Sequence, residues 1–512
     1  MSNARQENQS RYYDAVVAVE QHLDVDALTY RGVHIWPIVR DELYHKINTL
    51  SPAEIANSRT RALALAYDRR LEAEPRIPVD AEALRSVYGR VTAGREPATG
   101  ADLVLLSRDW EHRPGPDGRQ FNRYIDPYLA VLAGDFDVVK IELAGEIGEK
   151  QRNRWWETAF FPMPDLGPYF ELFRQNPAPV EGMDHLNDIM RRLDLAQFNE
   201  KFLRNEMDLI LAQAEYFKIV LNRLLPKLAG TTCYYCNPGY GLMKACHDLG
   251  IPSVDIQHGG VADIHCSYMH YSKVPEGGYD LLPDFFWVWS DYFRRKTEQT
   301  LPPGNLHHRT IIGGDMDLTM SLESSPASPM VEKDEWRPFI AERREWRRNI
   351  LVAPGVLFGD ENSINIVIDA ILQGPDDWFW MIRAHPYSHA ESDRVEWEKS
   401  FKDNGLSNFD IKISSEMPLG RLLPLCDHLV TSWSGICFDA LALGIPSTFT
   451  DPHAAWCTPD GVRDGYFFLG DTPEELLASI REHKRGEIDP GDAAPVLERG
   501  RAKAALDIML GR

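Results

Sequence analysis

The sequence predicts an α/β fold of two Rossmann-like, doubly wound domains, each built on a parallel sheet. From Ala101 onward, short apolar runs without polar alternation recur between helix-like stretches, as is typical of strands covered on both faces. A proline- and serine-rich segment, residues 324–330, interrupts this series, which then begins again. The chain has 512 residues, too many for one hydrophobic core. We therefore expect two domains that face each other across a cleft.

The pattern divides the chain into four regions. Residues 1–98 predict a helical N-terminal extension, residues 99–300 the first Rossmann-like domain, residues 301–490 the second, and residues 491–512 a C-terminal helix. Within the extension, the aromatic stretch at residues 30–47 has the spacing of an amphipathic helix. We expect it to pack on the next domain, although an acceptor surface or a membrane-facing patch would have the same pattern.

A strand–helix–strand unit lies in the first domain. A helix pattern ends at Gly250, and the following strand, residues 252–257, leads into a loop of Gln257, His258, Gly259 and Gly260. This loop falls at the carboxyl edge of the sheet, where open α/β sheets bind their ligands. The strand before the helix is expected at residues 231–236 and contains Cys233 and Cys236. Because no second cysteine pair follows at zinc-ribbon spacing, we interpret these thiols as structural.

His258 is the best candidate for a general base. An imidazole titrates near neutral pH and can take a proton from an attacking hydroxyl, while the glycines beside it leave room for a ligand. Asp255 is the second catalytic candidate, and Asp263, His265 and His270 are further ones. The spacing of these residues fits no compact ligand set, so no metal site is expected.

The second domain repeats the alternation, with strands expected at residues 349–355, 378–386, 409–414, 428–435 and 446–450. Arg383, His385 and Pro386 follow the second of these strands, where Arg and imidazole N–H groups can donate to phosphate oxygens. A loop histidine that caps a helix is the alternative. Gly355 ends the first strand at a turn where a missing side chain lets the backbone approach a ligand.

A hydroxyl-rich loop follows the fourth strand of this domain. Thr431, Ser432, Ser434 and Gly435 stand directly before a helix, so that hydroxyls and backbone N–H groups can hold an anion there. N-capping by Ser434 is a compatible alternative. Asp439, about one turn into the helix, can bind a ribose or sugar hydroxyl, or be an ordinary solvated residue.

The overall charge and hydropathy restrict the partners. A formal net charge of −22 argues against general affinity for nucleic acid. No run of about 18 apolar residues and no signal-peptide pattern is present, so we expect a cytoplasmic protein with reduced thiols. Peripheral contact with the inner face of the membrane stays open.

Three motifs together resemble a known family. Gln257–Gly259 (QHG), Arg383–Pro386 (RAHP) and Thr431–Gly435 (TSWSG) with the following FDAL helix are similar to bacterial glycosyltransferases of the GT-B fold. The resemblance is to enzymes of capsule, lipopolysaccharide and teichoic-acid assembly that use CMP- or CDP-activated donors. It implies that His385, Ser432 and Ser434 contact the donor phosphate and that His258 is the base. The polyol-phosphate enzymes have a tryptophan where this chain has Gln257, and the acidic motif of sialyltransferases is not evident.

The predicted function is transfer of a sugar from a nucleotide-activated donor, linked to CMP, CDP or UDP, to a surface-polysaccharide or glycolipid acceptor. The donor is a co-substrate, and neither a cofactor nor a metal is expected. The acceptor, a saccharide or a lipid-linked one, is expected on the side of Gln257, Gly259 and Gly260. Three alternatives remain: a CDP-polyol phosphotransferase, a nucleotide-sugar 2-epimerase, and a non-catalytic carbohydrate-binding or scaffold protein.

Overall fold

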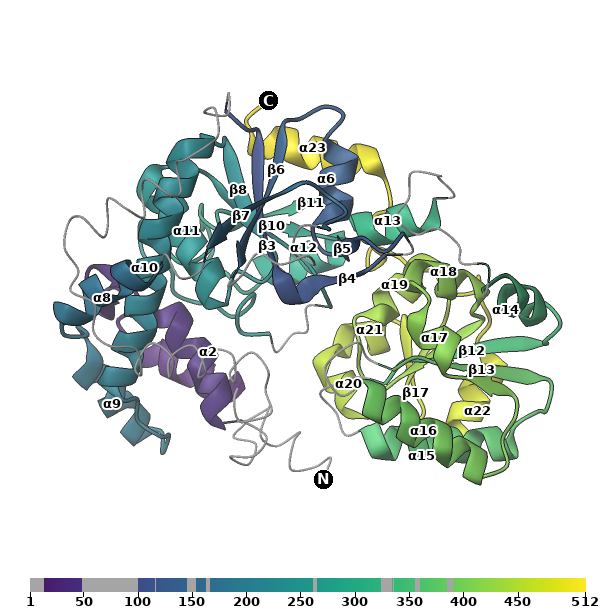
Figure 1. The fold of residues 1–512 in the computed structure, drawn as a ribbon. Helices are drawn as coiled ribbons and strands as arrows, with labels where there is room; N and C mark the ends of the chain where they lie inside the picture. The colour runs from purple at the N-terminus through teal and green to yellow at the C-terminus, as the bar shows by residue number, and fades with distance from the viewer. Residues whose placement is uncertain are drawn as a thin grey trace.

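A computed structural model describes most of the chain, and Figure 1 shows two α/β bodies, with the C-terminal helix returned to the first of them. The described residues are 13–47, 100–115, 117–144, 153–162, 166–260, 265–323, 334, 336–354, 360–384 and 390–512. Most of the predicted helical extension, together with Gly355, His385, Pro386 and Asp263, lies outside these ranges.

The first body is built on a parallel sheet of seven strands, counted over the described residues. In spatial order they are β11 (Arg309–Ile312), β10 (Phe285–Val288), β9 (Ser253–Ile256), β8 (Leu228–Thr231), β3 (Leu103–Arg108), β6 (Val138–Ala144) and β7 (Thr158–Pro162). The interior strand β3 is buried along its whole length. This is the doubly covered parallel sheet that the apolar runs predicted.

Helices cover both faces of this sheet. Successive side chains of β3 point to opposite faces, so each face carries apolar side chains for a helix layer to bury. Val104 and Leu106 join the core formed with α8 (Gly167–Gln175), α10 (Glu200–Leu224) and α11 (Asn237–Leu249). Leu103 and Leu105 join the opposite core, with α6 (Asp126–Leu132) and α23 (Arg499–Met509). The predicted C-terminal helix is therefore α23, a covering helix of the first domain.

Two sequence-based expectations are corrected in this domain. β11 pairs with β10, so the first sheet extends beyond the boundary expected at residue 301. The boundary was missed because the segment before β11 has the polar character of a linker. The expected strand at residues 231–236 is also wrong, since β8 ends at Thr231 and Cys233 turns the chain with a φ of 59°.

The described part of the N-terminal region packs on the first domain. It contains the short hairpin β1 (Thr29–Tyr30) and β2 (Val33–His34), followed by α2 (Trp36–Ile47). Arg40 on α2 is buried and donates to the carbonyl oxygens of Cys266 (3.0 Å) and His270 (2.8 Å). The aromatic stretch therefore serves packing, as expected.

The second body holds six parallel strands among its described residues. In order they are β14 (Phe409–Asp410), β13 (Trp378–Ile382), β12 (Arg348–Val352), β15 (His428–Thr431), β16 (Ser447–Phe449) and β17 (Phe467–Leu469). The five predicted strands are present, and β17 is additional. β14 is much shorter than expected because the chain turns into α17 (Lys412–Glu416) after Ile411.

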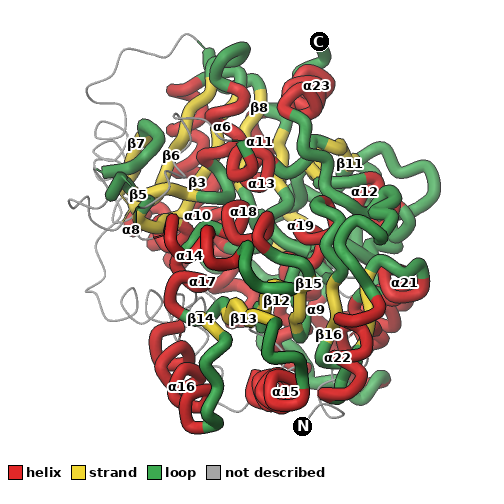
Figure 2. The backbone as a smooth tube through the Cα atoms, turned by 90° about the vertical axis from the view of Figure 1, so that its right-hand side faces the viewer, coloured by secondary structure: helices red, strands yellow, loops and turns green. Residues whose placement is uncertain are grey.

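The remaining elements complete the layers. They are η1 (Asp109–Glu111), β4 (His112–Pro114), β5 (Gln120–Asn122), α9 (Met183–Arg192), α12 (Asp291–Glu298), α13 (Met316–Leu322), α14 (Trp336–Arg343), α15 (Asp360–Gln373), α16 (Ala390–Asp403), α18 (Leu419–Leu422), η3 (Leu423–Leu425), α19 (Ile436–Ala442), α20 (His453–Cys457), α21 (Pro459–Arg463) and α22 (Pro473–Glu482). Helix α13 contacts α6 of the first domain and α18 of the second, and Figures 1 and 2 show it between the two bodies. The predicted two-domain α/β fold is confirmed.

Within the described ranges, no helix is both long and apolar enough to cross a membrane.

Candidate functional site

The loops after β9 and β15 bring the two domains into contact. A Cβ atom built on Gly260 would lie 2.9 Å from the ring of Trp433 and 3.2 Å from the Cα of Gly435. A Cβ on Gly435 would lie 2.5 Å from the backbone nitrogen of Gly260. Such distances leave no space for a side chain at either position. The predicted loops of the two domains are therefore brought together, glycine against glycine.

Gln257 determines the shape of the loop that carries His258. Its side chain is buried, and its amide nitrogen donates to the carbonyl oxygen of Gly259 (2.9 Å). Its amide oxygen accepts from the backbone N–H of Trp289 (2.9 Å), while its own backbone N–H donates to Trp287 (2.9 Å). The residue thus ties the loop to the end of β10.

His258 lies between two tyrosine rings at the carboxyl end of β9. Its ring meets that of Tyr124 edge-on at 5.7 Å and lies roughly parallel to that of Tyr235 at 6.3 Å. Burial, followed by the charges of Arg108, His265 and Arg123, lowers the pKa of His258 to about 3. Its Nδ1 is buried and has no hydrogen-bond partner among the described residues. The imidazole is therefore neutral at pH 7.

The other candidates near β9 have different surroundings. Asp255 is buried, accepts from the backbone N–H of Tyr234 (2.8 Å) and from the hydroxyl of Tyr268 (2.7 Å), and burial raises its pKa to about 7. His265 packs against Tyr235 (5.1 Å between ring centroids), and burial lowers its pKa to about 4. The catalytic role of Asp255 stays a prediction, since both its oxygens are already bonded inside the protein. His270 is elsewhere, beside Tyr13 and Arg40.

A charged cluster that the sequence did not reveal joins the two domains beside these loops. Arg123, which follows β5, forms an ion pair with Asp317 of α13 (2.9 Å), and Asp315 caps the same helix through the N–H of Leu318 (3.1 Å). The charges of Asp315 and Asp317 act on Asp439 of α19. Burial, followed by the charge of Asp317, raises the pKa of Asp315 to about 6, and burial raises that of Asp439 well above its ordinary value. We infer that these carboxyls share protons at neutral pH.

Three arginines from both domains surround this carboxyl cluster. Arg383 donates to the carbonyl oxygens of Ser414 (2.8 Å) and Met417 (2.6 Å). Burial, followed by the charges of Arg113 and Arg123, lowers the pKa of Arg383 to about 9. The charges of the same three guanidinium groups oppose the rise in the pKa of Asp317 that burial causes. Positive charge from the first and second domains is thus gathered at one place.

The hydroxyl-rich loop follows β15 as predicted, with one correction. Thr431 and Ser432 are buried, and the hydroxyl of Thr431 has no hydrogen-bond partner among the described residues. The N-cap position of α19 is Gly435, one residue later than the sequence suggested, and a glycine has no side chain to cap the helix. A capping role for Ser434 stays a prediction. Asp439 is buried and is not the solvated residue of the other alternative.

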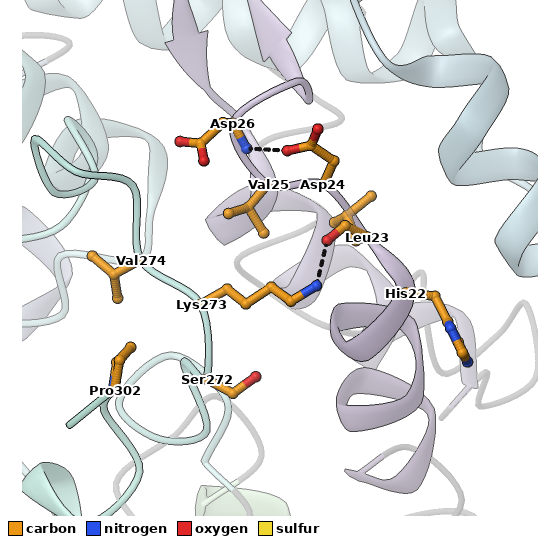
Figure 3. A pocket seen from close by; sticks show the side chains of 9 residues that line it. All are labelled: His22, Leu23, Asp24, Val25, Asp26, Ser272, Lys273, Val274 and Pro302. Atoms are coloured by element: carbon orange, nitrogen blue, oxygen red, sulfur yellow. Dashed lines mark hydrogen bonds between the residues drawn. The ribbon is translucent and has the colours of Figure 1, made fainter.

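A metal cluster and a surface pocket would be other possible ligand sites. No group of three or more His, Cys, Asp or Glu residues in the described part of the chain could hold a metal ion. An open pocket of about 540 Å³ lies between residues 22–26, residues 272–274 and Pro302 (Figure 3). Its cation, Lys273, donates to the carbonyl oxygens of Gln21 (3.0 Å) and Leu23 (2.7 Å). The pocket contains none of the predicted site residues.

Comparisons with known proteins find similar structures but no similar sequence. No protein-family model and no curated protein sequence matches the chain. A UDP-GlcNAc 2-epimerase from Methanocaldococcus jannaschii has a TM-score of 0.48 and 10% identity, over 80% of this chain and 99% of that one. The UDP-GlcNAc 2-epimerase from Neisseria meningitidis bound to UDP-GlcNAc has a TM-score of 0.47 and 13% identity, over 80% and 98%. The wall teichoic acid polymerase TagF, with CDPG, has a TM-score of 0.39 and 12% identity, over 90% and 93%.

Proposed function

We propose that this protein is a glycosyltransferase that moves a sugar from a nucleotide-activated donor to a hydroxyl acceptor. One observation carries the proposal: the neutral imidazole of His258, half-buried, stands where the loops of the two domains meet. A transfer reaction needs a base that is neutral at working pH and is shielded from water. The lowered pKa of His258 meets the first condition, and we propose that bound substrates supply the second.

In the proposed reaction, the acceptor oxygen forms a bond to the anomeric carbon of the donor sugar. The bond between that carbon and the donor phosphate breaks, and the nucleotide leaves with the electron pair. The imidazole of His258 takes the acceptor proton. A pKa of about 3 makes the free imidazole a weak base. A donor phosphate beside it would raise that pKa, because a neighbouring anion favours the protonated form. Proton uptake is thereby linked to donor binding.

The charge distribution supports a phosphate on the side of the second domain. Arg113, Arg123 and Arg383 supply positive charge from both domains, and Arg123 carries a buried Nε without a partner among the described residues. The unbonded hydroxyl of Thr431 is a further donor at the same loop. Fixed guanidinium groups and hydroxyls can stabilise a leaving phosphate without a metal ion. We therefore propose metal-independent binding, and assign His385 and Ser434 to the same phosphate.

The first experiment measures thermal stabilisation by CMP, CDP, UDP, GDP and ADP, with and without magnesium. A ligand that binds only the folded state raises the Tm with the logarithm of its concentration. We expect a metal-independent shift with one pyrimidine nucleotide, lost in Arg123→Met. No shift with any nucleotide would overturn the donor site.

The second experiment separates transfer from its alternatives by product analysis with the matching donor. His258→Ala is expected to bind the nucleotide and to lose turnover, whereas His270→Ala, a histidine outside the site, keeps both. Transfer of a polyol phosphate, or release of an altered sugar without an acceptor, would indicate a phosphotransferase or an epimerase. Unchanged function in His258→Ala would favour the non-catalytic alternative.

A further inference from the structure

The turn between β8 and α11 holds two cysteines that the proposed reaction does not use. Cys233 adopts a left-handed conformation, with a φ of 59°, and Cys236 is the N-cap residue of the 13-residue helix α11. Both residues are half-buried, whereas the other five cysteines are buried, and all seven are free thiols. In its protonated form, Cys236 donates to the carbonyl oxygen of Cys233 (3.2 Å). The turn therefore places the two thiols close together at the start of α11.

Arg108 is fixed beside this pair. Its Nε donates to Glu111 (2.8 Å) and its Nη2 donates to the carbonyl oxygen of Thr232 (2.9 Å). These bonds direct Nη1 at the sulfur of Cys236, at 3.3 Å. A guanidinium group at this distance stabilises a thiolate. The arginine is held in place by its own partners, so it does not depend on the thiolate for its position.

The two thiols differ in acidity for reasons that the geometry explains. A hydrogen bond from the Cys233 thiol, the charge of Arg108 and the backbone N–H of Gly239 lower the pKa of Cys236 to about 6. The same hydrogen bond and burial raise the pKa of Cys233 well above its ordinary value. The acidic groups that face Cys236 are Glu111, Asp255 and Asp41, and negative charge on them opposes the thiolate. One thiolate beside one thiol is the arrangement of a redox-active dithiol.

We propose that Cys233 and Cys236 form a redox-active pair that exchanges with small-molecule disulfides. The Cys236 thiolate attacks one sulfur of the disulfide, breaks its S–S bond and releases one thiolate. Cys233 then loses its proton and attacks the Cys236 sulfur of the mixed disulfide, which releases the second thiolate. The two protein thiols are oxidised to one disulfide, and the small disulfide is reduced to two thiols.

The pair is connected to the candidate site through Tyr235, which lies between the two cysteines in the chain. The ring of Tyr235 packs against His258 at 6.3 Å and against His265 at 5.1 Å. Closing the disulfide fixes the backbone on both sides of this tyrosine. Oxidation therefore changes the surroundings of His258. An effect of that change on catalysis rests on the proposed function, whereas the thiol chemistry does not.

Iodoacetamide alkylation of the folded protein, followed by peptide mass mapping, tests the thiol chemistry. At pH 7 we expect Cys236 to react at least tenfold faster than any other cysteine, and the rate to depend on pH with a midpoint near 6. Arg108→Gln should move that midpoint upward, and Cys246→Ser, a buried control, should leave it unchanged. Rates for Cys236 no faster than those of the buried cysteines would overturn the proposal.

Oxidised glutathione tests the exchange itself. We expect the wild-type protein to lose two hydrogen atoms and to form a bond between Cys233 and Cys236 that dithiothreitol reverses. Cys233→Ser should stop at the mixed disulfide on Cys236, and Cys236→Ser should not react. A wild-type pair that stays reduced, or a mixed disulfide that never resolves, would overturn the assignment even if the protein proves to be a glycosyltransferase.

Discussion

Gly260 and Gly435 touch across the two domains, and neither position has room for a side chain. The backbone nitrogen of Gly260 would lie 2.5 Å from a Cβ on Gly435, closer than such atoms can approach. Gly259, the neighbouring glycine, has open space instead, with nothing within 4 Å of a Cβ. The contact therefore depends on two particular glycines, one from each α/β domain.

Replacing Gly435 by alanine is expected to push the two loops apart. Because the clash is with backbone and not with a flexible side chain, we expect a loss of about 1–3 kcal/mol in the free energy of unfolding. Small-angle scattering should show a larger radius of gyration, and urea unfolding should give the energy. Gly259→Ala is the matched control and should change neither. A Gly435→Ala protein with wild-type values would show that the domains meet differently.

Arg123 is predicted to hold the carboxyl cluster of both domains. Arg123→Met leaves Asp315, Asp317 and Asp439 without their nearest cation, and we expect a loss of about 1–3 kcal/mol at pH 7. The loss should shrink below pH 5, where the carboxyls are protonated. Adding Asp317→Asn should recover part of it. Urea unfolding of the single and double variants measures both effects, and an equal loss at all pH values would contradict the assignment.

His428 gives a pH-dependent prediction whose sign follows from burial. The residue is fully buried between β12 and β16, its Nε2 bonds Thr448 (2.8 Å), and burial lowers its pKa to about 3. Because the unfolded chain binds a proton at about pH 6.5 and the folded chain does not, His428 lowers stability as the pH falls from 6.5 towards 3.

The variant His428→Asn tests whether His428 lowers the stability of the wild type as the pH falls. We expect the variant to have a lower free energy of unfolding than the wild type at pH 7.5. Below pH 6.5 this difference should shrink by at most about 1.4 kcal/mol per pH unit, because only the wild type is destabilised by its buried, neutral histidine. Urea unfolding between pH 7.5 and 5 measures the difference. His307→Asn, in an exposed loop region, is the control. A deficit that grows on acidification would contradict the prediction.

The sequence predicted the sheets well and the site only in part. Strands β3 and β12 could be predicted because burial on both faces gives an unbroken apolar run. β17 could not, since an edge strand this short carries no such run, and β14 was predicted but is shorter than expected. His258 follows a strand and Thr431 ends one, and both were found for that reason. Arg123 and Asp317 were missed because their partnership spans both domains and depends on where α13 packs.

Gln257 provides a last prediction, on the loop that positions His258. Gln257→Met removes the bonds to the N–H of Trp289 and the carbonyl oxygen of Gly259, both 2.9 Å, and leaves two polar groups without partners. We expect a loss of about 1–3 kcal/mol in the free energy of unfolding. The ring of His258 should also move relative to Tyr124, which NMR of ¹³C-labelled histidine can detect.

Gln213→Met is the matched control for this change. Gln213 is also buried, but its amide oxygen has no partner among the described residues, so its replacement removes an unsatisfied group. The control should therefore be neutral or slightly stabilising. If both variants lose the same stability, side-chain volume and not hydrogen bonding explains the effect, and Gln257 does not position His258. If only Gln257→Met is destabilised and its histidine signal moves, the amide is what holds the imidazole between the domains.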